Sequence, residues 1–86
     1  MCINFKEEVM YKNLNIPGAI RGLRKERDLS QGDLFELTGL KESYISKLEN
    51  GHIKPTLETI SKLSKAFGIS VSEFLEYAEN THGGKK

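Results

Sequence analysis

The sequence predicts an all-α fold, with one compact domain of five short helices in 86 residues. Three observations predict it. Apolar residues recur every three or four positions, which is the spacing that places them on one face of a helix. Serine and threonine, which cap helix N-termini, precede several of these stretches, and glycine follows several of them. Because a chain of this length buries a single core, no second domain is expected.

The stretch at the centre of the chain predicts a helix over 31–38. Ser30 is placed to cap its N-terminus, and Asp33 stands where the acid of a capping box belongs. Gly39 follows the helix, and glycine adopts the left-handed conformation that ends one helix and turns sharply into another.

A second helix is expected over 42–50, with Leu40 packed in the corner before it. Ile45 and Leu48 continue the apolar stripe, and Asn50 is followed by a glycine. The two segments therefore predict a helix, a tight turn and a helix with apolar inner faces. The side chains expected to point outward from the second helix are Lys41, Glu42, Ser43, Ser46 and Lys47.

Three further helices flank this pair. The first is expected from about Pro17 to Arg27, because proline is tolerated in a first turn. Thr56 is placed to cap a fourth helix that ends at Gly68. Ser70 and Glu73 form the capping box of a fifth. The apolar side chains expected in the shared core are Ile20, Leu23, Leu34, Leu37, Ile45, Leu48, Ile60, Leu63 and Phe67, with Leu57 and Ser64 on the inner face of the fourth helix and Val71, Phe74 and Leu75 closing the core.

The sequence divides into an N-terminal arm over 1–15, a helical domain over 16–79 and a flexible tail over 80–86. The arm contains Ile3 and Phe5, which fit either a partly ordered segment that packs on a partner subunit or a frayed terminus. The tail is rich in glycine and lysine and has nothing to bury.

Composition excludes several classes of protein. No apolar run is long enough to cross a membrane, and no signal peptide is evident. Cys2 is the only cysteine, so no intrachain disulfide forms and a cytoplasmic location is expected. His52 and His82 fall in a loop and in the tail, without the spacing of a metal site or a catalytic triad. We therefore expect no enzyme activity, no cofactor and no metal.

The net charge is only +1, so the distribution of charge carries more information than the total. Acidic residues collect near the C-terminal end, whereas basic residues precede the central pair of helices. The distribution fits a face that meets phosphate groups, and it also fits an ordinary mixed surface. The basic cluster consists of Arg21, Arg24, Lys25 and Arg27.

The central pair of helices resembles the helix-turn-helix of the Cro/C1-type (XRE-like) family of DNA-binding repressors. The resemblance covers roughly residues 16 to 77. The residues that carry it are Ser30-Gln31, Leu34, Gly39-Leu40, Tyr44-Ile45-Ser46 and Leu48-Glu49-Asn50-Gly51, with flanking matches at Ile20-Arg21, Leu23 to Glu26, Pro55-Thr56-Leu57, Ile60, Leu63, Phe67-Gly68-Ile69 and Phe74-Leu75.

The resemblance implies a lambda-repressor-like, five-helix fold and a transcriptional repressor that binds double-stranded DNA as a homodimer, with helix 42–50 in the major groove. It also implies a structural ion pair between Arg24 and Glu49, although Arg24 is able to touch phosphate as well. Residues near the N-terminus of a recognition helix reach base edges. These are Lys41, Glu42, Ser43 and Lys47, while the expected phosphate contacts are Gln31, Tyr44, Ser46, Asn50, Lys54 and Thr56.

Some of these roles have structural alternatives. Glu42 also suits a helix N-terminus through the helix dipole, Tyr44 also suits the edge of the core, and Lys54 is also an ordinary solvated lysine.

The sequence departs from the family pattern at three positions. Phe35 stands where the family has alanine or another small residue, so either the two helices spread apart or the ring turns outward. Gly32 adds flexibility at the start of the first helix of the pair. Lys41 stands where a serine or threonine caps the recognition helix, so that cap is lost.

Other functions remain open. Among DNA-binding regulators, a phage-type repressor, an antitoxin-type autoregulator and a restriction-modification controller look alike in sequence. A protein-interaction module of the same fold, with an unidentified protein partner and no DNA binding, is a separate class. For a homodimer, the expected contact is the fifth helix with Phe74, Leu75, Tyr77 and Ala78; the arm is a second possibility and a monomer a third.

Overall fold

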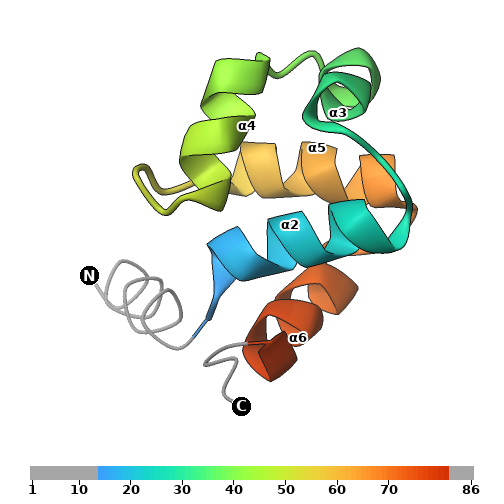
Figure 1. Ribbon diagram of the computed structural model, residues 1–86. Helices are drawn as coiled ribbons and strands as arrows, with labels where there is room; N and C mark the ends of the chain where they lie inside the picture. The colour runs from blue at the N-terminus through green and yellow to red at the C-terminus, as the bar shows by residue number, and fades with distance from the viewer. Residues whose placement is uncertain (1–13, 82–86) are drawn as a thin grey trace.

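A computed structural model describes residues 14–81 (Figure 1). In this range the chain forms helices and no strand, which confirms the all-α, five-helix prediction. The helices are α2 (Ile16–Glu26), α3 (Gln31–Thr38), α4 (Glu42–Glu49), α5 (Leu57–Phe67) and α6 (Val71–Thr81). Helix α6 extends two residues into the segment that the sequence assigned to the tail. The expectations for Cys2, for the arm with Ile3 and Phe5, and for His82 lie outside the described residues.

Local hydrogen bonds fix where the helices begin. Ser30 and Asp33 form the predicted capping box of α3, with both side-chain-to-backbone bonds at 2.9 Å. Ser70 and Glu73 form the equivalent box at α6, with bonds of 3.0 and 2.8 Å. The Thr56 hydroxyl accepts from the third residue of α5, as expected. The first helix begins one residue before the predicted proline.

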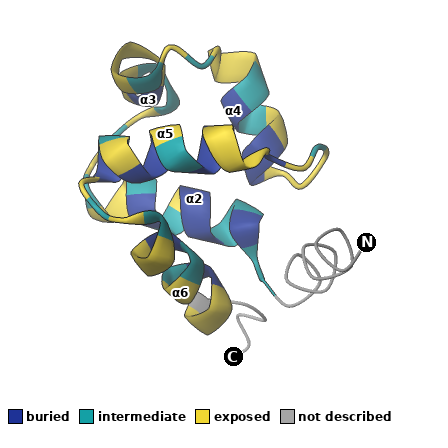
Figure 2. Cartoon of the chain, turned by 180° about the vertical axis from the view of Figure 1, so that it is seen from behind, coloured by how far each residue is buried: buried dark blue, intermediate teal, exposed yellow. Residues whose placement is uncertain are grey.

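Helix α2 lies at the centre of the fold. Figure 1 shows it in front of α5, with α6 below and the α3–α4 pair above, and it contacts α4, α5 and α6. Seen from behind in Figure 2, buried residues occupy one side of each helix and exposed residues the other. The core contains eight of the nine predicted residues and four more; its members are Ile16, Ala19, Ile20, Leu23, Leu34, Ile45, Leu48, Ile60, Leu63, Phe67, Phe74 and Ala78.

The burial of two leucines was predicted wrongly. Leu37 is 57% exposed because the inner edge of α3 runs through Gln31, Leu34 and Thr38, which leaves Leu37 on the outer side. Leu57 is 67% exposed, since it is the first residue of α5 and lies at the rim of the bundle.

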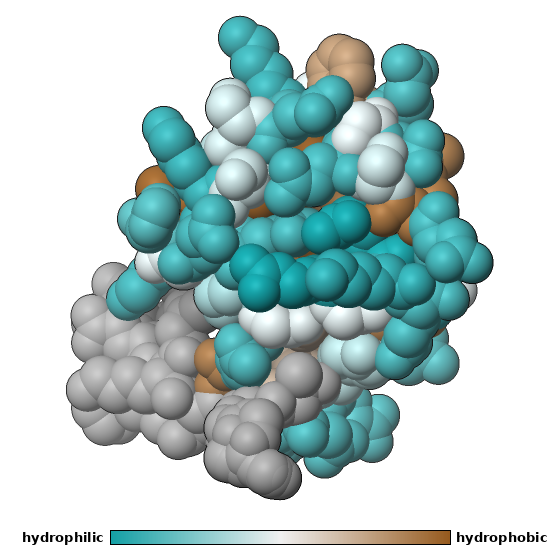
Figure 3. Space-filling view, in the orientation of Figure 1, coloured by the Kyte–Doolittle hydropathy of each residue, from teal (hydrophilic) through white to brown (hydrophobic). Residues whose placement is uncertain are grey.

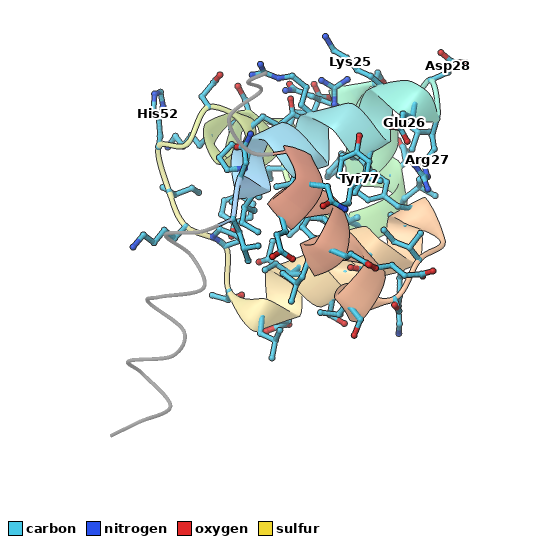
Figure 4. The ribbon with its side chains drawn as sticks, turned by 90° about the horizontal axis from the view of Figure 1, so that it is seen from below. Lys25, Glu26, Arg27, Asp28, His52 and Tyr77 are labelled. Atoms are coloured by element: carbon cyan, nitrogen blue, oxygen red, sulfur yellow. The ribbon has the colours of Figure 1, made fainter. Side chains whose placement is uncertain are left out.

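Helix α6 buries more of its apolar side chains in the core than the sequence suggested. Phe74 and Ala78 are both 0% exposed, and the Phe74 ring stacks on that of Phe67 with the centroids 6.4 Å apart. The Tyr77 hydroxyl donates to Glu26 at 2.8 Å, and its side chain points towards α2 in Figure 4. The expectation that Ala78 belongs to a free surface was therefore wrong, because α2 and α5 already cover this side of α6.

No helix among residues 14–81 is long and apolar enough to span a membrane.

Candidate nucleic-acid interface

The turn between α3 and α4 holds the exposed helix α4 in a fixed orientation. Gly39 ends α3 with φ 80°, in the left-handed region, and its backbone N–H donates to the Phe35 carbonyl. Ile45 and Leu48 are buried on the inner face of α4. Of the four side chains predicted to read bases, Ser43 and Lys47 lie one turn apart on the opposite face, and Lys41 and Glu42 lie at the N-terminal end of α4; all four are exposed.

The N-terminus of α4 has an unusual cap. Lys41 is the capping residue, and its side chain makes no capping hydrogen bond, as the sequence predicted. The backbone amides of the first turn therefore face outward without a side-chain acceptor from that position. Beside them the Phe35 ring is 42% exposed, so it turns outward, which is one of the two outcomes expected for a large side chain there.

A buried carboxylate joins three helices beneath this surface. Glu49 of α4 is 2% exposed in its side chain. It accepts from Nε of Arg24 at 2.7 Å and from Nη2 of the same residue at 3.0 Å, which is the fork-shaped pairing typical of arginine and a carboxylate. It also accepts from Nε2 of Gln31 at 3.2 Å. Residues of α2, α3 and α4 thus meet at one carboxylate.

The pKa values of this cluster follow from its charges. Burial raises the pKa of the Glu49 carboxyl, but hydrogen bonds from Arg24 and Gln31 and the positive charges of Arg24 and Arg21 outweigh it. The pKa of Glu49 therefore lies below its ordinary value of 4.5. The hydrogen bond to Glu49 raises the pKa of Arg24, against the lowering effect of burial. Both groups are charged at neutral pH, so the cluster is a salt bridge.

Arg21 is a member of this cluster that the sequence analysis left without a site role. Its Nη2 donates to the Glu49 carbonyl at 3.3 Å and to Oδ1 of Asn50 at 3.2 Å, at the C-terminal end of α4. An arginine at a helix C-terminus satisfies a free carbonyl and complements the helix dipole. The sequence feature that could have indicated this role is the spacing of the two arginines, because Arg21 lies three residues before Arg24 on one face of α2.

The six residues expected to contact phosphate lie in different environments. Gln31 is half-buried on Glu49, and Asn50 is bonded to Arg21 and, at 3.4 Å, to Ser46. The Tyr44 hydroxyl lies 3.2 Å from that of Thr59 at the edge of the core, which fits the structural alternative for Tyr44.

The remaining two expected phosphate contacts, Lys54 and Thr56, lie around the start of α5. Thr56 caps that helix, and its hydroxyl also donates to the Thr59 hydroxyl. Lys54 is exposed on the loop that follows α4. The phosphate-contact set is therefore not one uniform row of exposed donors.

Comparison with known proteins identifies the family. Residues 20–74 match the HTH_3 helix-turn-helix family. This chain belongs to that Cro/C1-type (XRE-like) family of transcription regulators. It is 40% identical over 57 residues to the HTH-type transcriptional regulator PuuR of Escherichia coli, covering 66% of this chain and 31% of PuuR. The chain therefore spans about a third of the length of that relative.

Solved structures show the same fold. The restriction-modification controller protein C.AhdI from Aeromonas hydrophila is 33% identical, with a TM-score of 0.68 over 74% of this chain and 97% of C.AhdI. The clp gene regulator ClgR from C. glutamicum is 24% identical, with a TM-score of 0.74 over 81% of this chain and 91% of ClgR. The fold predicted from the sequence is thus that of the helix-turn-helix regulators.

The surface of this helix-turn-helix protein is mostly hydrophilic on the side that carries α2, α3 and α4 (Figure 3). His52 is exposed in the loop after α4, on the opposite side of Figure 4 from Lys25 and Asp28. Within residues 14–81, no three His, Cys, Asp or Glu side chains gather closely enough to hold a metal ion.

Proposed function

We propose that this chain binds specific sequences of double-stranded DNA as a homodimer, represses transcription and inserts α4 into the major groove. The observation that carries the proposal is one short helix, α4. Its outward side chains are polar, and its C-terminal end is held by the buried Arg24–Glu49–Gln31 cluster. An α-helix fits the width of the major groove, and its N-terminal residues meet base edges in helix-turn-helix proteins.

Base reading is assigned to Lys41, Glu42, Ser43 and Lys47. The two lysines donate to guanine O6 and N7, the glutamate accepts from cytosine N4, and serine suits either partner. Lys47 lies one turn after Ser43 on the same side of α4, so the set follows the groove rather than one base pair.

Phosphate anchoring is assigned to Gln31, Tyr44, Ser46, Asn50, Lys54 and Thr56. The Gln31 side-chain nitrogen donates one of its two hydrogens to Glu49, so its second hydrogen and the backbone N–H in the first turn of α3 are the proposed donors to phosphate at this position. Lys54 contributes a charge from an exposed loop. Contacts of this kind position the protein and carry no sequence information directly.

The dimer contact is assigned to α6. One recognition helix reads too few bases for selectivity, and paired half-sites lie about 34–36 Å apart or a multiple of that. Phe74 and Ala78 are buried in the core, so Leu75 and Tyr77 are the expected residues that remain partly exposed, together with Val71 one turn before Leu75. Leu75→Lys should shift sedimentation towards the monomer at micromolar concentration, whereas Leu37→Lys on α3 should not. An unchanged dimer in the first variant would reject this surface.

The test of DNA binding is selection of duplexes from a random pool, followed by titration of the selected duplex at several salt concentrations. Lys54→Ala should weaken all duplexes about equally and lower the salt slope by roughly one unit. Lys47→Ala should relax the preference at one base pair. If no duplex is enriched, or binding is insensitive to salt, the chain does not act as a DNA-binding regulator and the protein-interaction alternative gains support.

A further inference from the structure

A shallow recess of about 240 Å³ lies at the N-terminal end of α4, and it is lined by Phe35, Lys41 and Glu42. Its lining residues therefore carry an aromatic ring, an ammonium group and a carboxylate. Phe35 comes from α3 and is 42% exposed, whereas Lys41 and Glu42 belong to the cap and the first turn of α4. The recess lies within the set of residues proposed to face base edges.

The carboxylate of Glu42 lies beside Gly32 of α3. A Cβ atom built on Gly32 would lie 3.1 Å from Oε2 of Glu42 and 3.7 Å from its Cδ, so the carboxylate rests against the backbone of α3. Gly32 and Phe35 lie three residues apart on one face of that helix. Glu42 and Phe35 thus line the same recess from α4 and α3.

This set of groups matches one base pair in particular. Across the major-groove edge of a G·C pair, the guanine presents two acceptors, N7 and O6, and the cytosine presents its N4 amino donor. The next atom along the cytosine edge is C5. An ammonium, a carboxylate and an apolar ring are complementary, respectively, to the guanine acceptors, the cytosine amino donor and a methyl group at C5. Thymine instead places its O4 acceptor beside the methyl group, where a carboxylate would be repelled.

We propose that this recess reads a G·C pair and prefers its cytosine methylated at C5, with Phe35 as the specificity-determining residue for the methyl group. The inference rests on the proposed DNA binding and adds the chemistry of one base. Glu42 accepts from N4, Lys41 donates to the guanine, and the Phe35 ring covers the methyl group. Burial of one methyl-sized group gives about a fourfold gain in affinity.

The experiment is parallel selection from three random duplex pools, made with ordinary nucleotides, with 5-methylcytosine in place of cytosine, and with uracil in place of thymine. The selected duplex is then titrated with the wild-type chain and with Phe35→Ala, Glu42→Gln and Leu37→Ala. The last variant is the matched control, because Leu37 is another exposed apolar side chain on α3. Thermal melting checks that each variant is folded.

The expected result is that the wild-type chain binds the methylated duplex about fourfold more tightly for each methylated half-site, with the gain confined to one G·C pair per half-site. Phe35→Ala should abolish that gain and keep the affinity for the unmethylated duplex within about twofold, whereas Leu37→Ala should keep the gain. Glu42→Gln should reduce a preference of roughly tenfold for cytosine over thymine at that pair.

Other results overturn the inference. A methylated duplex bound no more tightly, or a gain that persists in Phe35→Ala, removes the role of the ring. Loss of binding from the uracil pool that depends on Phe35 would assign the ring to thymine instead. In each of these cases a selected duplex still shows that the chain binds DNA. Enrichment of no duplex from any pool would overturn the proposed function as well.

Discussion

The buried pair of Arg24 and Glu49 should contribute strongly to stability, and a double-mutant cycle measures its coupling. Glu49→Met removes the acceptor of three hydrogen bonds from a side chain that is only 2% exposed. It leaves the Arg24 guanidinium, which is 13% exposed, without its anion. Removal of one partner from a buried pair costs about 3–5 kcal/mol. A domain of this size has a total stability of roughly 4–13 kcal/mol, so the loss is a large fraction of it.

The two other corners of the cycle follow from the same geometry. Arg24→Met leaves a buried carboxylate that Gln31 and the more exposed Arg21 still contact, so its cost should be somewhat smaller, about 2–4 kcal/mol. In the double variant no buried charge lacks a partner, and two unbranched apolar side chains occupy the space. We therefore expect the double variant to cost at least about 2 kcal/mol less than the sum of the single variants.

Urea unfolding at neutral pH, with the slope of each transition reported, measures the four free energies of unfolding. The control is the same cycle on Glu58 and Lys62, an exposed pair on α5 with its charged atoms 3.7 Å apart. Pairs of that kind contribute about 0.3–0.5 kcal/mol on a helix. A coupling for Arg24 and Glu49 as small as that of the surface pair would refute the prediction that this buried pair contributes strongly to stability.

Three further predictions concern stability. The pKa of Glu49 is lowered in the folded chain, so its contribution to stability is fully present above the ordinary value of 4.5 and is lost as pH falls through the lower folded pKa. Acid should therefore destabilise the wild type more than Glu49→Gln, as measured by unfolding curves at stepped pH. Ser64→Ala should raise stability by about 1 kcal/mol, since the buried hydroxyl has no hydrogen-bond partner among the described residues; a lower melting temperature would show that the hydroxyl is satisfied. Gly39→Ala should cost about 1–2 kcal/mol through backbone conformation alone, because φ is 80° and nothing lies within 4 Å of the added carbon; urea unfolding without a loss would count against it.

The beginnings and ends of the helices could be predicted because their causes are local. A capping box such as that of Ser30 and Asp33 spans four residues, and a glycine such as Gly39 ends a helix within one turn. The outward turn of Phe35 was one of two expected outcomes, and the choice between them depends on the space between α3 and α4. That space is a property of the packed structure, which a local pattern does not contain.

Burial at the ends of helices could not be predicted for the same reason. Leu37 and Leu57 have the apolar character of core residues, but no helix within residues 14–81 covers them. On α6 the error was in the opposite direction, because Phe74 and Ala78 were expected in part to exceed what one core absorbs, and α2 and α5 enclose both. Which apolar residues remain for a partner therefore depends on contacts between helices that are distant in the sequence.

The candidate site shows how a family pattern and a physical structure complement one another. The resemblance implied a pair between Arg24 and Glu49 and a phosphate contact at Gln31 as separate roles. In the structure one carboxylate accepts from both residues, so the contact that fixes α4 also fixes the first turn of α3. The amides of that turn and the outward face of α4 are then held in one rigid arrangement. It follows that a substitution at Glu49, although buried and remote from bases, should disturb phosphate anchoring and base reading together.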